Sequence, residues 1–289
     1  MTTTPTIGAT MSVITLPSSI TSSEERLVDP PARRAGLVTA SAAVAGRTLR
    51  QFWRTPQLIV VGALTSAMFL LIFRYVFGGA IDTGRVAYAD FLIPAMAVTT
   101  GLFASGAVGV ADDIESGLFD RLRSLPVPRS TTLLGRSLAD TVLITWGTLI
   151  TIALGFATGF RFHGSAVDAV AAIGLCVLCG AAFTWPFIYM GLVSGSSQAA
   201  QGMSFMAFPF VFVSSAYVPV DSMPGWLQPV AEHQPITAMV GAVRSLALGG
   251  DATAVLGHST TWFVVRALAW VAVILAVFVP LASRRFARS

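Results

Sequence analysis

The sequence predicts an all-α polytopic membrane protein with six transmembrane helices. Only 11% of its 289 residues are charged, against roughly 25% in soluble domains, and the mean hydropathy is +0.75. Six apolar runs follow one another, each long enough to cross a hydrocarbon core about 30 Å thick. We place them at 57–77, 89–110, 132–160, 168–193, 201–219 and 261–282. They fill a predicted transmembrane domain over 57–285, which leaves no room for a soluble catalytic domain.

The residues before the first span are of two kinds. Residues 1–35 are rich in Ser and Thr and lack a secretory signal, so we expect a disordered cytoplasmic tail. Residues 36–56 carry apolar side chains on one helical side, with Arg47, Arg50 and Arg54 clustered near the end. This pattern predicts an amphipathic helix lying in the inner membrane interface. A partly ordered basic linker is the alternative for this stretch.

The arginines predict how the spans are oriented. The chain has no lysine, and all 18 basic residues are arginine. With the N-terminus inside, 13 of the 18 arginines fall in cytoplasmic segments and five fall outside. We therefore expect a multi-pass protein of the cell membrane whose two termini, including a short tail at 286–289, are cytoplasmic. The basic composition follows from this topology and does not indicate nucleic-acid binding.

A charged segment separates the second and third predicted spans. Read at helical spacing, Leu118, Leu122 and Leu125 form one apolar stripe. Acidic residues come first and arginines follow, an order that suits the helix dipole, and two prolines then end the helix. We predict a cytoplasmic amphipathic helix over 112–125 that a soluble partner could grip.

Residue types that carry chemistry are scarce. A phosphate-binding loop of the Walker A type needs a lysine, which this chain does not contain. The three histidines fall in predicted outer loops without metal-ligand spacing, so no metal site is expected. Cys176 and Cys179 form a CxxC pair inside the fourth span, where helix packing is a better interpretation than redox chemistry. The sequence therefore predicts a protein that is not itself an enzyme.

Polar and aromatic side chains at the span centres are candidates for lining a path. They are Thr99, Thr100, Ser105, Thr145, Trp146, Thr184, Trp185, Ser204 and Phe205. Ordinary helix packing is the alternative for each, as it is for Gly155-x3-Gly159 and Gly191-x3-Gly195. Ionisable residues within the spans, such as Asp140, fall toward span ends, and Arg136 and Asp140 are spaced to pair on one helix. An ion- or proton-driven carrier, which usually needs such groups near mid-membrane, is therefore the weaker alternative.

The stretch from 220 to 250 is too apolar for a solvated loop and too broken for a span. We expect short helices dipping into the outer leaflet, with Trp226 at the level of the lipid headgroups. Candidate residues for an outer lid are Pro224, Trp226, Gln234, Pro235 and Arg244. A compact extracellular cap without a transport role is the alternative.

Together these features resemble the ABC-2 family of transporters. The resemblance rests on the N-terminal amphipathic helix, six spans, Glu115-x-Gly117 followed by Arg121-x-Arg123, and Met223-Pro224-x-Trp226 followed by Gln234-Pro235. It covers about residues 36–285. Within the family, the chain is most similar to permease subunits of daunorubicin/doxorubicin-type exporters from actinobacteria.

The resemblance implies a transmembrane subunit that works with other chains. Such permeases pair with a separate ATPase, which binds ATP and Mg, in an assembly of two permeases and two ATPases. The implied coupling residues are Asp112, Asp113, Glu115, Gly117, Leu118, Phe119, Arg121, Leu122 and Arg123. Expected partners are the ATPase, a second permease in a homodimer or heterodimer, and membrane lipids. An amphiphilic drug or lipid-like substrate is the expected cargo.

Overall fold

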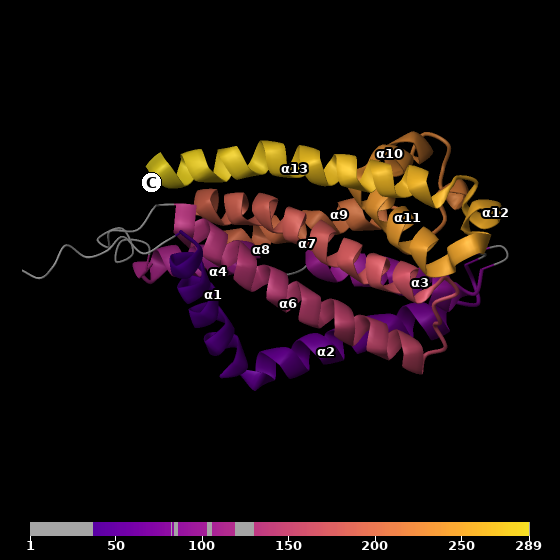
Figure 1. Ribbon diagram of the computed structural model, residues 1–289, viewed down its shortest axis with the longest axis horizontal. Coiled ribbons are helices and arrows are strands. Elements are labelled where there is room, and N and C mark those ends of the chain that lie inside the picture. The colour runs from indigo at the N-terminus through magenta and orange to yellow at the C-terminus, as the bar shows by residue number, and fades with distance from the viewer. Residues whose placement is uncertain (1–36, 82, 84–85, 103–105, 119–129, 289) are drawn as a thin grey trace, which may run out of the picture. The chain divides into compact units, whose positions relative to one another are not determined.

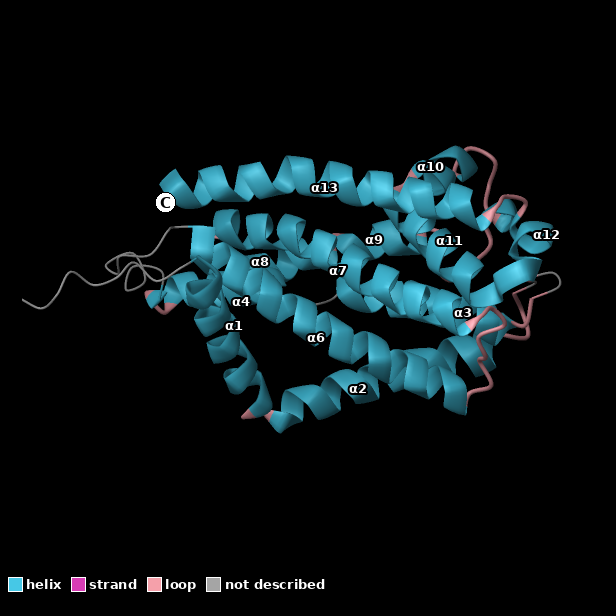
Figure 2. Cartoon of the chain, in the orientation of Figure 1, coloured by secondary structure: helices cyan, strands magenta, loops and turns pink. Residues whose placement is uncertain are grey.

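The computed structural model describes residues 37–81, 83, 86–102, 106–118 and 130–288. Every regular element in that part of the chain is helical (Figure 2). Five helices are long and apolar enough to cross a membrane: Val60–Phe77, Tyr88–Glu115, Thr132–Ala157, Ala166–Ser194 and Thr260–Ala287. The second of these runs over 103–105, which lie outside the described residues. The all-helical, polytopic fold class is confirmed.

The first two helices meet at a proline. Helix α1 (Leu37–Trp53) is followed by α2 (Pro56–Leu71), which continues as the short π-helix η2 (Ile72–Phe77). Pro56 is the first residue of α2, where its missing N–H has no helical partner to lose. Figure 1 shows the corner that results. Helix α1 lies along α6 (Ser130–Ala157), and Trp53 meets Trp146 edge-on with 5.6 Å between ring centroids.

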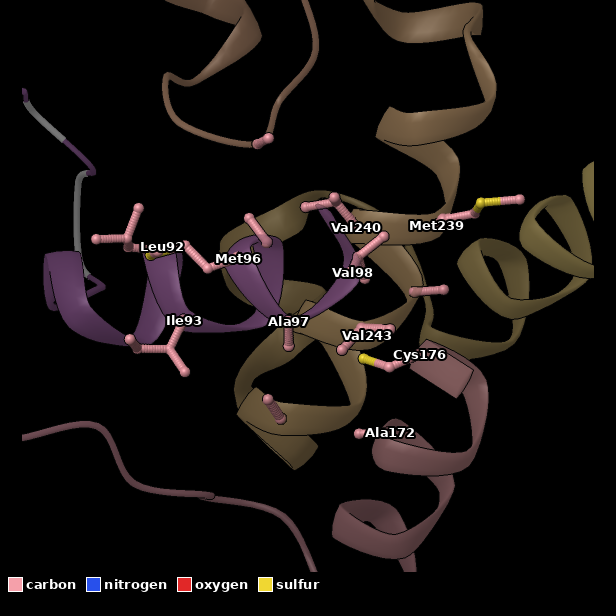
Figure 3. Close-up of a cluster of buried hydrophobic side chains, with 14 of the residues drawn as sticks. Leu92, Ile93, Met96, Ala97, Val98, Ala172, Cys176, Met239, Val240 and Val243 are labelled. Carbon is pink, nitrogen blue, oxygen red and sulfur yellow. The ribbon is translucent and has the colours of Figure 1, made fainter. Parts of the chain in front are cut away.

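The core forms where α3 (Tyr88–Leu102), α7 (Ala166–Ser194) and α11 (Pro235–Leu248) meet, with α6 and α13 (Thr260–Arg288) packed around them. In Figure 3, Ile93 and Ala97 of α3 converge with Cys176 of α7 and Val243 of α11. Cys176 and Cys179 are both buried free thiols in this cluster. Their burial among apolar side chains agrees with the helix-packing interpretation.

Helix α7 begins two residues before its predicted start at 168, at a capping motif. The Ser165 hydroxyl accepts the Asp168 N–H at 3.2 Å, and the Asp168 carboxylate accepts the Ser165 N–H at 2.9 Å, which makes a capping box. At the other end, Gly195 closes the helix with a φ of +72°. Helix α13 runs six residues past its predicted end at 282, to Arg288.

The single helix predicted over 201–219 is not found. Its place is taken by α8 (Ser197–Phe205) and α9 (Ala207–Phe212), followed by turns. Pro209 has no N–H to donate to the Phe205 carbonyl, so the helical ladder is interrupted next to that position. The Met206 N–H bonds instead to the Met203 carbonyl, three residues back, at 3.1 Å. The apolar run was read correctly, but its continuity as a helix was not.

The stretch from 220 to 256 contains several short helices. They are η3 (Val220–Ser222), α10 (Gln228–His233), α11, η4 (Gly249–Asp251) and α12 (Ala252–Leu256). Helix α11 is buried along almost its whole length and packs against α3, α7 and α13. It therefore belongs to the bundle and not to a surface loop.

Candidate functional site

The acidic residues of the predicted coupling helix close a helix instead of opening one. Helix α4 (Gly106–Glu115) holds Asp112, Asp113 and Glu115 in its last turns. Gly117 has a φ of +67°, in the left-handed region that glycine adopts at helix ends. The helix predicted to run unbroken over 112–125 is therefore wrong at its start.

The described part of the coupling segment ends just after this turn. Leu118 is its last described residue and is half-buried. Phe119, Arg121, Leu122 and Arg123 lie outside the described residues.

Asp113 joins three helices through arginines. Its carboxylate lies 3.5 Å from Arg47 Nη2 of α1 and 3.4 Å from Arg136 Nη1 of α6. Arg136 Nε also lies 3.2 Å from Asp140 Oδ1, one turn further along α6, which confirms the expected pair. Asp140 is only 2% exposed, so its charge depends on this arginine.

Two glycines of α4 leave room for this ion cluster. A Cβ at Gly109 would stand 1.9 Å from Arg136 Nη2, and a Cβ at Gly106 would stand 3.2 Å from Asp140 Oδ2. The guanidinium of Arg136 therefore occupies space that any other residue at position 109 would fill. This close approach holds α4 against α6 at the end that carries the acidic residues predicted to take part in coupling.

Asp112 and Glu115 face a different neighbour. Glu115 Oε1 accepts the backbone N–H of Ser197 at 2.9 Å, and its Oε2 accepts the Ser197 hydroxyl at 2.9 Å. Asp112 Oδ1 is a second acceptor for the same hydroxyl. Residues 112 and 115 are three apart and share one helix face, whereas 113 is turned away from it. Ser197 is the first residue of α8, so the acidic turn fastens α4 to α8.

Sequence reasoning missed Ser197. It lies 82 residues from Glu115, in a short Ser-rich connection that has no motif of its own. The only local signal was the pair Ser196 and Ser197 ahead of a helix, which is typical of an N-cap. Ser196 does serve as that cap, since its hydroxyl accepts the Ala199 N–H at 3.1 Å.

The predicted pathway residues do not come together in one place. Thr99, Thr184 and Trp185 are buried in the bundle. Thr100 bonds to Thr151 of α6 at 3.1 Å, while Ser204 and Phe205 lie on α8. Ser105 lies outside the described residues.

Thr145 and Trp146 line a separate cleft between α6 and α1. Its other lining residues are Leu49, Trp53, Val142, Leu143 and Leu149, and its volume is about 190 Å³. The walls are almost entirely apolar side chains, and two tryptophans stand opposite each other across the two helices. Of the predicted pathway residues that the structure describes, Thr145 and Trp146 are the two that line the cleft.

Of the five predicted lid residues, two are exposed, two are half-buried and one is buried. Pro224 is exposed and Trp226 is 76% exposed. Gln234 donates from Nε2 to the Val213 carbonyl at 2.7 Å. Arg244 is 2% exposed, and its guanidinium carbon lies 3.6 Å from the centroid of the Phe91 ring. The same guanidinium donates to the carbonyls of Phe91 and Ser215. Pro235 is the first residue of α11. Gln234 and Arg244 thus fasten α11 to the turn that follows α9.

The histidines make contacts of a structural kind. His163 Nε2 lies 3.8 Å from Asp90 Oδ2, His233 Nδ1 lies 2.9 Å from the Pro229 carbonyl, and His258 stacks on Trp262. Among the described residues, no three His, Cys, Asp or Glu side chains gather in a way that could hold a metal ion.

Comparison with known proteins gives consistent matches along most of the chain. Residues 39–248 match the profile of the ABC-2 type transporter family. A daunorubicin resistance ABC transporter permease of Streptomyces coeruleorubidus is 30% identical over 290 residues, which cover 99% of this chain and 98% of that protein. A probable doxorubicin resistance ABC transporter permease of Mycobacterium tuberculosis is 26% identical, over 84% of this chain and 92% of its own length. A probable multidrug ABC transporter permease of Escherichia coli is 25% identical over 61% of this chain.

Proposed function

Because the chain belongs to the ABC-2 type transporter family and is the transmembrane subunit of an ABC exporter, we propose that it forms the export pathway for an amphiphilic drug or lipid-like substrate. The relatives named for daunorubicin and doxorubicin resistance support this class of cargo, because both compounds are amphiphilic. The apolar and aromatic content of the spans supports it further. The observation that carries the proposal is the family match over most of the chain.

The proposed energy source is a separate ATPase that binds ATP and Mg. The chain has no lysine for a Walker A loop, so hydrolysis by that machinery must come from another chain. We assign the docking surface to the segment that follows Gly117, including Leu118, Phe119, Leu122 and the arginines at 121 and 123. ATP binding would close the ATPases and push this segment, and the Asp113–Arg136 contact would pass the push to α6.

The proposed topology places both termini in the cytoplasm, in the cell membrane. Helices α8 and α9 together make the fifth of six crossings, and α13 makes the sixth. Helix α1 lies in the inner interface, and α10 and α11 enter from the outer side. The capping of α8 by the cytoplasmic end of α4 supports this arrangement, because it puts the start of α8 on the inner side. A second permease, either a copy of this chain or a sister chain, completes the pathway.

Arg121→Glu tests the proposal. We expect this variant to lose co-purification with the ATPase and to lose ATP-dependent daunorubicin uptake into inside-out vesicles. The reason is that the substitution reverses a charge on the docking surface. The amount of the variant protein in the membrane should stay normal. The matched control is Arg285→Glu, the same change near the end of α13, where Arg285 is exposed. The coupling role is wrong if Arg121→Glu transports normally. The proposed ATP-driven energy source is wrong if a proton ionophore stops uptake while ATP is held constant, which would indicate proton-driven transport.

A further inference from the structure

The pair of helices α8 and α9 is fastened at both ends and sparsely packed between them. We infer that α8–α9 is the connecting element that carries ATPase-driven movement from the end of α4 to the outer helix α11, with Glu115 and Ser197 as its positioning residues. The inference rests on the proposed function, because it needs an ATPase acting on the segment after Gly117. It names the internal route that the movement takes.

The inner attachment joins the coupling turn directly to α8. The Glu115 carboxylate accepts both the N–H and the hydroxyl of Ser197, each at 2.9 Å. A carboxylate at a helix N-terminus is also favoured by the helix dipole. Glu115 is only two residues from Gly117, where the docking segment begins. A displacement of that segment therefore reaches α8 through one short, charge-assisted contact.

The outer attachment joins the turn after α9 to α11. The Ser215 N–H bonds to Thr237 Oγ1 at 3.1 Å, and Arg244 Nη2 donates to the Ser215 carbonyl at 2.9 Å. Gln234 holds the Val213 carbonyl at 2.7 Å. Three side chains at the start and along the length of α11, those of Gln234, Thr237 and Arg244, thus hold Val213 and Ser215. Because α11 packs on α3, α7 and α13, movement delivered here acts on the outer part of the bundle.

The stretch between these attachments has little core to disturb. Its buried residues are Ala200 and Val211, and its exposed residues are Gln198, Ala199, Gln201, Gly202, Phe205, Met206, Pro209, Phe210 and Phe212. Moving a tightly packed helix forces its neighbours to repack, which is costly in a dense interior. Helix α6 packs against α1, α3 and α7, whereas α8–α9 contacts chiefly α4 and α7. Because α8–α9 packs against fewer helices than α6 does, it can move as a unit with less repacking of its neighbours.

Ser197→Pro breaks the inner attachment without breaking the helix. Ser197 is the first residue of α8, a position where proline is favoured because its N–H has no helical partner. The preceding residue, Ser196, has the extended conformation (φ −156°, ψ 155°) that a following proline requires. The substitution removes both donors to Glu115. The matched control is Ala166→Pro, the same change at the first position of α7 after the extended residue Ser165, far from α4.

The readout is movement of α9 in the complex of the full-length chain with its co-purified ATPase. Cysteines that replace Phe210 of α9 and Val273 of α13 carry one pair of spin labels, which reports the 210–273 distance. A second pair, at positions 149 of α6 and 273, reports the 149–273 distance. All three positions are exposed, whereas native Cys176 and Cys179 are buried and leave little background labelling. Distances are compared between the nucleotide-free complex and the complex trapped with ATP and vanadate.

We expect ATP and vanadate to shift the 210–273 distance, and Ser197→Pro to remove most of that shift. ATPase co-purification and the 149–273 shift should persist, and Ala166→Pro should behave as the unmodified chain. The number of daunorubicin molecules moved per ATP should fall by roughly tenfold, because Glu115 loses both of its donors on Ser197. Glu115→Ala should lower transport per ATP by the same factor, and Ser197→Thr, which keeps both donors, should transport as the unmodified chain does. The Glu115→Ala/Ser197→Pro double variant should transport no less per ATP than either single variant.

The inference is overturned if the 210–273 distance shifts equally in Ser197→Pro, or if it never shifts while 149–273 does. It is also overturned if Glu115→Ala alone loses the ATPase, because Glu115 would then be a docking residue. If the ATPase binds but neither distance responds to ATP in the unmodified chain, the proposed ATP-driven function fails instead. The two failures are therefore distinguishable.

Discussion

Arg136 forms ion pairs with two carboxylates, at the point where α4 meets α6. It bonds Asp113 and Asp140, and Gly109 leaves the space in which its guanidinium lies. A buried ion pair adds little net stability, but removing one partner is costly because the other charge is left uncompensated. The structural role of Arg136 is therefore to keep α4 and α6 in register, close to the coupling turn.

Replacing Arg136 with Met tests this role. Asp140 is 2% exposed and would lose its cation, so the variant should lose about 3–5 kcal/mol of stability, or on the order of 10 °C in the melting temperature of the purified permease. The double variant Arg136→Met/Asp140→Leu should recover much of this loss, because an apolar pair in place of a buried ion pair is often neutral. Equal melting of the single and double variants would show that the uncompensated charge at Asp140 is not the cause.

At the scale of elements, prolines show that packing decides whether a helix stays continuous. Pro94, Pro186 and Pro280 lie inside α3, α7 and α13, which run on through them. Pro209 lies where two short, largely exposed helices meet, and there the ladder breaks at Met206. Neighbouring helices surround the buried Pro94 and Pro186 and hold α3 and α7 together, whereas α8–α9 has few such neighbours. Pro280 is itself exposed, on a helix that packs against α7 and α11.

Pro209→Ala should therefore join α8 and α9 into one helix. The new N–H at 209 can bond to the Phe205 carbonyl, so amides of residues 206–212 should exchange more slowly with deuterium, measured by mass spectrometry on the purified permease. Pro186→Ala is the matched control, and there we expect little change because α7 is already continuous. Exchange that stays as fast in Pro209→Ala as in the unmodified chain would mean that sparse packing alone causes the break.

Elements with a strong local signal were predictable from the sequence. Helix α2 begins at Pro56 and α7 follows the cap at Ser165, each within two residues of the prediction, because apolar runs and capping residues are local features. The break before Pro209 depends on which helices lie next to α8 and α9. The end of α4 at Glu115 depends on the left-handed conformation of Gly117. The spacing of apolar residues in the sequence predicts neither feature.

The candidate site divides in the same way. The Arg136–Asp140 pair was predictable because the two residues are one turn apart on one helix. The pair Gly191-x3-Gly195, read as packing, has two roles instead: a Cβ at Gly191 would meet the Ala107 carbonyl at 2.5 Å, whereas Gly195 ends α7. The contact between Glu115 and Ser197 joins residues 82 apart, and only the folded arrangement reveals it.

At the scale of the whole molecule, α2 is a span that its own chain barely covers. Only 11% of Val60–Phe77 is buried, against 87% of the most apolar part of Tyr88–Glu115. Apolar exposure alone does not separate a lipid-facing surface from a protein interface, because lipid tails are as apolar as leucine. Helix α2 also carries Gly62-x3-Ser66, a spacing of small residues that favours close helix contacts in membranes, and a Cβ at Gly62 would meet nothing.

A second permease on this face would also contact the element that we expect to move. Phe73 of η2 lies 6.5 Å from Phe212 of α9, between ring centroids, so α2, η2 and α9 adjoin. A photo-reactive benzoylphenylalanine at Thr65, an exposed position one turn from Gly62, should therefore cross-link to another permease. The same label at Val273 of α13 is the control, since Thr260–Ala287 is only 17% buried and so comparably uncovered. Mass spectrometry of the Thr65 adduct distinguishes a second copy of this chain from a sister permease. An adduct with lipid alone at Thr65, or a permease adduct only at Val273, would show that the interface between permeases does not lie on α2. The interface would then be separate from α8–α9.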